Sequence, residues 1–70
     1  MKIMNTHLRK LRTEKGITIS ELAAAVQIDV GNLSRIERGI QLTSLENAKR
    51  IVDYFNGAIT EMEILYPNKF

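Results

Sequence analysis

The 70-residue chain has no cysteine, no tryptophan and one proline, and its only aromatic residues are two tyrosines and two phenylalanines. A chain without cysteine forms neither a disulfide nor a thiolate metal site, and this composition is typical of the reducing cytoplasm. Long hydrophobic runs are also missing, and the amino-terminal segment MKIMNTHLRKLR has the features of neither a signal peptide nor a membrane anchor. We therefore expect a cytoplasmic protein that does not enter a membrane.

Groups that carry out catalysis are scarce in this chain. His7 is the only histidine, and no acidic cluster has the spacing of metal ligands. We expect His7 to pack or to face solvent, and we expect no enzyme activity, no metal and no cofactor. A chain of this size buries only about 60% of the surface that it exposes when unfolded, so tight helix packing or dimerisation must stabilise it.

Charge is distributed unevenly, although the formal net charge is only +2 at pH 7. Residues 1–15 hold five basic side chains and one acidic one, whereas residues 53–70 hold three acidic side chains and one basic one. This asymmetry is expected when one surface meets phosphate, and a solvated helix face has the same appearance.

Helix starts and stops divide the chain into five segments. The pattern Ser/Thr-x-x-Glu, which favours a capping box, begins at Thr18, Thr43 and Thr60, and Asp29 is a further N-cap candidate. Glycines at 16, 39 and 57, and Pro67, follow periodic segments. These signals predict helices over about 5–15, 18–26, 29–38, 44–55 and 60–65, and no segment alternates with period two, so the predicted fold is all-α. The predicted core consists of Leu8, Leu11, Ile17, Leu22, Val26, Ile28, Leu33, Ile36, Ala48, Ile51, Val52 and Phe55.

Residues 18–38 have the pattern of a helix-turn-helix. Apolar residues are spaced for the inner faces of two helices, and the three residues Gln27-Ile28-Asp29 separate these helices. Ala23 is small at the point where the two helices would cross. The second helix keeps one face towards water and can enter a DNA major groove. The pattern therefore predicts a sequence-specific DNA-binding protein.

A family resemblance agrees with this prediction. The motifs LRKLR at 8–12, GIT at 16–18, ELA at 21–23 and LSRIERG at 33–39 resemble the phage repressor/Cro-like, or Xre-type, helix-turn-helix family. The resemblance implies one compact, five-helix, lambda-repressor-like domain over residues 1–70. It also implies a homodimer that binds double-stranded DNA at a near-palindromic operator and represses transcription or regulates its own gene.

Three positions depart from the family pattern. Ile19 stands where the family usually has a glutamine that contacts DNA, and the second helix begins with the weakly polar run Asp29-Val30-Gly31. Gln27 stands where the turn usually has glycine, and a positive φ at this residue would cost about 1 kcal/mol.

Candidate DNA contacts follow from family position. Arg35 can donate two hydrogen bonds to guanine O6 and N7, Val30 can contact a thymine methyl group, and Gly31 permits close approach. The candidate base-reading residues are Val30, Gly31, Asn32, Ser34 and Arg35. The candidate phosphate contacts are Thr18, Ser20, Arg38, Gln41 and Thr43, with Arg9 and Lys10 as flanking contributors. Each of these could also be an ordinary surface group.

Two further roles are expected from the resemblance and from the tail. Family position implies a partly buried ion pair between Arg12 and Glu37, which ties the first helix to the end of the third. The tail, residues 58–70, is too apolar for a chain of this size to hide, so it is a dimerisation candidate that would place two recognition helices about 34 Å apart. The tail could instead only cover the core of a monomer. The expected interface residues are Ile59, Met62, Ile64, Leu65, Tyr66 and Phe70.

A second possible function is that of a protein-binding module. An antitoxin-type or adaptor-type helix-turn-helix module has another protein as its main partner, and the weakly polar start of the second helix of the motif is compatible with that role.

Overall fold

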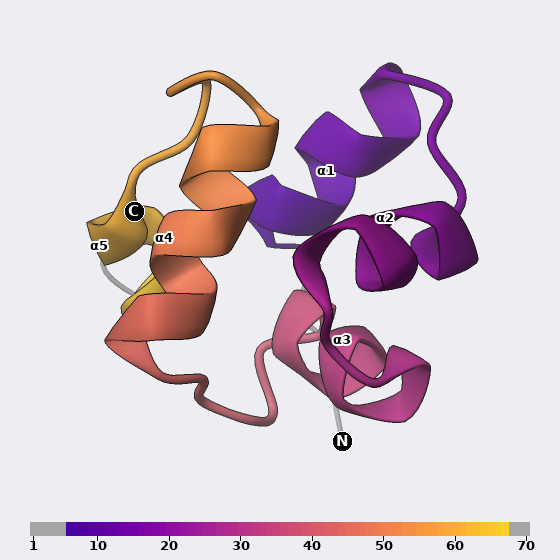
Figure 1. Ribbon diagram of the computed structural model, residues 1–70. Helices are drawn as coiled ribbons and strands as arrows, with labels where there is room; N and C mark the ends of the chain where they lie inside the picture. Colours follow the sequence, from indigo (N-terminus) through magenta and orange to yellow (C-terminus); the bar gives the residue numbers. More distant parts are fainter. Residues whose placement is uncertain (1–5, 68–70) are drawn as a thin grey trace.

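The computed structural model describes residues 6–67, and these residues form five short helices (Figure 1). Within this range there is no strand, and the predicted all-α fold is confirmed. Each helix begins and ends within about two residues of its predicted bounds. The helices are α1 (His7–Glu14), α2 (Ile19–Val26), α3 (Val30–Glu37), α4 (Leu45–Tyr54) and α5 (Glu61–Leu65).

Two of the predicted capping boxes are present. At the start of α2, the Thr18 hydroxyl accepts from the backbone N–H of Glu21 at 3.1 Å, and the Glu21 carboxylate accepts from the backbone N–H of Thr18 at 3.1 Å. Thr60 and Glu63 make the same reciprocal bonds at the start of α5. Each box satisfies backbone donors that a helix start otherwise leaves without partners.

The third predicted capping box, at Thr43, is wrong. Ser44 is the N-cap of α4, and its hydroxyl accepts from the backbone N–H of Asn47 at 3.1 Å. The Thr43 hydroxyl instead accepts from the side-chain amide of Asn47 at 3.1 Å. Both neighbouring residues carry a hydroxyl suited to capping, so the sequence signal was ambiguous by one residue.

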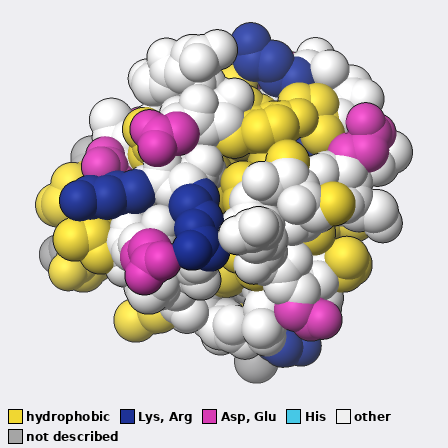
Figure 2. All heavy atoms as spheres, in the orientation of Figure 1, with side chains coloured by type: hydrophobic (Ala, Val, Ile, Leu, Met, Phe, Trp, Pro, Cys, Tyr) yellow, Lys and Arg dark blue, Asp and Glu magenta, His cyan; other side chains and the backbone are white. Residues whose placement is uncertain are grey.

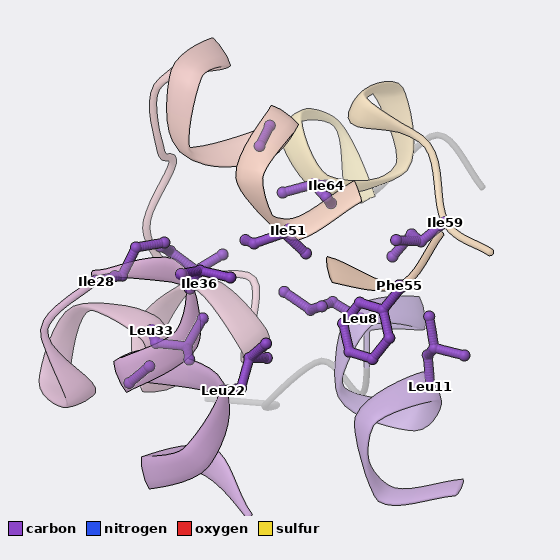
Figure 3. Packing of buried hydrophobic residues seen from close by; sticks show 13 residues of the cluster. Leu8, Leu11, Leu22, Ile28, Leu33, Ile36, Ile51, Phe55, Ile59 and Ile64 are labelled. Atoms are coloured by element: carbon purple, nitrogen blue, oxygen red, sulfur yellow. The ribbon is translucent and has the colours of Figure 1, made fainter. Parts of the chain in front are cut away.

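Thirteen buried hydrophobic residues of the described part of the chain form the core, and their side chains come from all five helices and from the segments between them (Figure 3). Leu22, Leu33 and Ile51 are completely buried. Helix α4 packs against α5 and α2, α2 packs against α3, and α1 packs against α5. Of the predicted core residues, only Ile17 and Val52 are partly rather than fully buried.

The core also contains two residues that we expected at a dimer interface. Ile59 is 1% exposed and Ile64 is 4% exposed, so neither side chain is available to a second copy. This expectation is therefore corrected. The amphipathic pattern of the tail identified apolar residues correctly, but these two cover the chain's own core, where the short α5 packs on α1 and α4.

The attachment of α5 to α1 also has a polar component. The His7 ring nitrogen Nδ1 contacts the Glu63 carboxylate across the two helices. Burial of this carboxyl would raise its pKa, but hydrogen bonds from His7 and Thr60 outweigh burial and hold the pKa of Glu63 below its ordinary value of 4.5. Glu63 is therefore ionised at neutral pH, where it serves both the α5 cap and the contact with α1.

The turn between α2 and α3 has the backbone conformation expected from the family pattern. Gln27 follows the last residue of α2 with φ +59° and ψ +42°, in the left-handed region. Its backbone N–H donates to the carbonyl of Ala23, so the strained residue also closes the helix. A side chain at this φ is unfavourable, and glycine avoids the penalty.

We expect Gln27→Gly to raise the free energy of unfolding by about 0.5–1 kcal/mol, because it removes the left-handed strain at an exposed position. Urea denaturation measures this change. Ala24→Gly is the matched control, since Ala24 is exposed inside α2, and there glycine should lower stability by about 1 kcal/mol. Equal losses in the two variants would contradict a strained Gln27.

Candidate nucleic-acid interface

The helix-turn-helix is formed by α2, the turn at 27–29, and α3, which lies at the edge of the molecule (Figure 1). Ala23 is 3% exposed on α2, as expected for a small residue at a close helix crossing. Asp29 caps α3, and its carboxylate accepts from the backbone N–H of Asn32 at 3.2 Å. The inner face of α3 is buried through Leu33, Ile36 and Glu37, whereas Val30 and Arg35 on the same helix are exposed.

All five candidate base-reading residues lie on α3. Val30 is 44% exposed and Arg35 is exposed, whereas Gly31, Asn32 and Ser34 are half-buried. The structure therefore brings these residues together along one helix.

Arg35 is held in a network of side chains that sequence reasoning missed. Its Nε donates to Gln41 Oε1 at 2.6 Å, and its Nη2 donates to Asn32 Oδ1 at 2.5 Å. Gln41 Nε2 also donates to Asn32 Oδ1 at 3.4 Å. Gln41 lies in the loop after α3, six positions from Arg35, so no helical spacing signals this contact.

The phosphate-contact candidates at the start of α2 have competing partners. The Thr18 hydroxyl is used in the capping box, whereas Ser20 is exposed. The backbone hydrogen bond from Thr18 lowers the pKa of Glu21 below its ordinary value of 4.5, so this carboxylate is ionised beside the helix start. An acid already occupies the N-terminal site at which phosphate was expected, a consequence of the Thr18–Glu21 box.

The remaining phosphate-contact candidates are dispersed. Arg38 is the C-cap of α3, is half-buried, and donates from Nε to the backbone carbonyl of Ser34 at 3.3 Å. Thr43 is also half-buried, and Arg9 and Lys10 are exposed on α1. In the view of Figure 2, Lys and Arg side chains are scattered, several of them beside acidic ones, and form no continuous basic patch.

Arg12 and Glu37 form the ion pair that family position implied. Arg12 donates from Nε to Glu37 Oε2 at 2.6 Å and from Nη2 to Oε1 at 3.0 Å. Its Nη1 donates to the backbone carbonyl of Ile17 at 2.8 Å. The Glu37 side chain is 2% exposed. One guanidinium thus joins α1 to the end of α3 and to the loop before α2.

A buried threonine completes this junction. The Thr6 hydroxyl donates to the backbone carbonyl of Glu37 at 2.6 Å and accepts from the backbone N–H of Arg9 at 3.3 Å. Thr6 caps α1 while it also anchors the end of α3. Position 9 is an arginine rather than a glutamate, so Thr6 has no capping-box signature. Its hydroxyl just before a periodic segment was the only available signal.

Besides Val30 and Tyr54, two groups of apolar side chains remain exposed among the described residues. Of the expected interface residues, Met62 is 54% and Tyr66 is 50% exposed, Leu65 is partly buried, and Phe70 lies outside the described residues. A second group follows α3 and was not predicted. It consists of Ile40, Leu42 and Leu45, which are 49%, 72% and 54% exposed.

Residues 6–67 contain neither a metal-binding cluster nor a membrane-spanning helix. Over this range no group of three or more His, Cys, Asp or Glu side chains is arranged to hold a metal ion. None of the helices described here has the length and apolar character needed to span a membrane.

Known proteins place this arrangement in a family. The sequence pattern of the helix-turn-helix family matches residues 8–62, so the chain belongs to that family, in agreement with its Xre-type resemblance. A curated relative is the HTH-type transcriptional regulator DdrOP3 of Deinococcus deserti, which is 34% identical over 55 residues. The match covers 79% of this chain and 43% of that protein, so the chain spans less than half of the relative's length. No solved structure matches the chain significantly.

Proposed function

We propose that this chain is a sequence-specific DNA-binding transcriptional regulator that places α3 in the major groove. One observation carries the proposal: Arg35 is exposed on α3, while the opposite face of the same helix is anchored in the core by Leu33 and Ile36. A helix presented in this way can enter the groove without disturbing the fold. Membership of the helix-turn-helix family and a relative named as a transcriptional regulator support the proposal.

In this proposal the residues of α3 contact different groups on the DNA bases. Arg35 donates to O6 and N7 of a guanine, Val30 contacts a thymine methyl group, and Gly31 allows the helix to approach closely. Ser20 and Arg38 contact phosphates on either side of the groove and set the orientation of α3. Phosphate contacts contribute affinity for every sequence, whereas the α3 contacts select one.

The proposal extends to assembly and to the direction of regulation. The chain acts in the cytoplasm as a homodimer on a near-palindromic operator and represses transcription. The exposed Met62 and Tyr66 are the remaining candidates for a contact between copies in the tail. A two-fold pair would place the recognition helices one DNA turn, about 34 Å, apart.

Two alanine substitutions test the division between base and phosphate contacts. We expect Arg35→Ala to weaken binding of a selected DNA site by about 1–3 kcal/mol and to relax the preference at one base pair. We expect Arg38→Ala to weaken binding of all sequences similarly and to reduce the slope of log affinity against log salt concentration by about one. Fluorescence anisotropy with labelled duplexes at several salt concentrations measures both effects.

Each variant is the control for the other, because Arg35→Ala should change the base preference and Arg38→Ala should change the affinity for all sequences. A retained base preference in Arg35→Ala would contradict the assigned base contact. Circular dichroism spectra of both variants should match that of the parent chain, since Arg35 is exposed and Arg38 is only half-buried.

A second candidate function is a module whose main partner is another protein. The exposed Ile40, Leu42 and Leu45, close in sequence to the end of α3, are the observation that favours it. Exposed apolar groups of this kind are typical of protein contacts. Stoichiometric copurification of a partner, with binding to DNA unaffected by Arg35→Ala and Arg38→Ala, would favour this function over the first.

A further inference from the structure

The side chain of Gln41 turns towards α3 rather than away from the molecule. It is half-buried, its carbonyl oxygen accepts from Arg35 Nε at 2.6 Å, and its amide nitrogen donates to Asn32 Oδ1 at 3.4 Å. Both ends of the amide are therefore engaged within the protein. This placement differs from the expected phosphate contact, in which the amide would point at DNA.

The contacts to Arg35 involve one particular edge of its guanidinium. An arginine can make paired hydrogen bonds from the side edge, formed by Nε and Nη2, or from the end edge, formed by Nη1 and Nη2. Gln41 and Asn32 accept from Nε and Nη2, so they occupy the side edge. Nη2 carries a second hydrogen, and together with Nη1 it can still form the end edge.

The end edge lies beside α3 at Gly31. A β-carbon placed on Gly31 would lie 3.1 Å from Asp29 Oδ2 and 3.6 Å from Arg35 Nη1, so Nη1 lies next to the one residue of the helix that has no side chain. Among residues 6–67, no hydrogen bond involves Nη1. A planar acceptor pair can therefore approach this edge without displacing a partner from the described part of the chain.

We infer that Gln41 and Asn32 are positioning residues, which fix the Arg35 guanidinium so that its end edge reads O6 and N7 of a guanine. This inference rests on the proposed function and deepens it by naming the residues that orient Arg35. Ordering a long side chain opposes binding, and here that ordering is present before DNA arrives. Gln41 and Asn32 thus act through Arg35 and not through their own contacts with DNA.

The test compares Gln41→Ala with the parent chain on duplexes recovered by selection, and on the same duplexes with each guanine exchanged for adenine in turn. We expect the discrimination ratio at the Arg35 guanine to fall about tenfold, the size of one paired contact made less favourable. Affinity for unrelated DNA and the salt slope should not change. Equal weakening on every duplex, with an unchanged ratio, would overturn the inference and return Gln41 to a phosphate contact.

The same substitution in an Arg35→Ala background supplies the control. Without the guanidinium there is nothing to position, so Gln41→Ala should leave the remaining discrimination unchanged. A further loss of discrimination in this background would show that Gln41 reads a base itself and would overturn the inference. A parent chain without any guanine preference would overturn the proposed function, and this inference with it.

A measurement without DNA tests the positioning of Arg35 separately from its recognition of guanine. In the ¹⁵N–¹H spectrum of the free protein, we expect the Arg35 Nε–H of the parent chain to be protected from exchange with water, because it donates a hydrogen bond to Gln41 Oε1. In Gln41→Ala this protection should be lost. Rapid exchange in the parent chain would overturn the positioning role even if Arg35 recognises guanine.

Discussion

Replacement of Glu37 with alanine should lower the free energy of unfolding by about 3–5 kcal/mol, because it leaves the Arg12 guanidinium without its charged partner in a buried site. The carboxylate accepts two hydrogen bonds from Arg12, and its side chain is 2% exposed. A chain of 70 residues has a total stability of only about 4–10 kcal/mol. The loss should therefore lower the melting temperature by more than about 10 °C.

Glu46→Ala is the matched control for this change. Glu46 pairs with Arg50 one helical turn away at 2.7 Å, but its side chain is 75% exposed and that of Arg50 is 41% exposed. An exposed pair of this kind contributes about 0.3–0.5 kcal/mol. Thermal and urea denaturation of the two variants compares the loss of the same glutamate side chain from a buried ion pair and from an exposed one. Similar small losses in both would contradict a structural role for the Arg12–Glu37 pair.

Leu33→Ala is expected to cost about 2–5 kcal/mol, because Leu33 is completely buried and its truncation leaves a cavity beneath α3. The same loss should weaken DNA binding at temperatures where part of the population is unfolded, although Leu33 contacts no DNA in the proposed complex. Affinity measured well below the melting temperature should recover, since the outward face of α3 is unchanged.

Leu42→Ala removes the same atoms from a side chain that is 72% exposed. Its free energy of unfolding should stay within about 0.5 kcal/mol of the parent value. Denaturation curves for the pair of leucine variants provide the measurement. A large loss on truncation of Leu42 would mean that another surface, such as that of a second copy, covers this side chain in solution.

The helices were predictable because the signals that set their bounds are local. Thr18 and Thr60 each reach an amide three residues away, and Gln27 closes α2 within one turn, so short stretches of sequence contain the complete arrangement. Thr43 shows the limit of such signals, since a neighbouring hydroxyl at Ser44 caps α4 instead. Local chemistry fixes where a helix begins only to about one residue when two candidates adjoin.

Contacts that depend on tertiary structure were harder to predict from the sequence. The apolar pattern of the tail shows that Ile59 and Ile64 need cover, but it does not show whether the core or a second copy provides it; the packing of α5 does. Likewise, no spacing rule joins Gln41 to Arg35, because a loop returns the glutamine to the helix. The Arg12–Glu37 pair could be predicted only from family position, since 25 residues separate its members.

In the proposed function, α3 presents a sequence-reading surface to DNA. Selection of bound duplexes from a random pool, at about physiological salt, is the decisive test of this role. We expect enrichment of a site that contains a guanine contacted by Arg35, with two half-sites one turn apart if the chain dimerises. A folded protein that enriches no sequence would contradict this role and would direct attention to a protein partner.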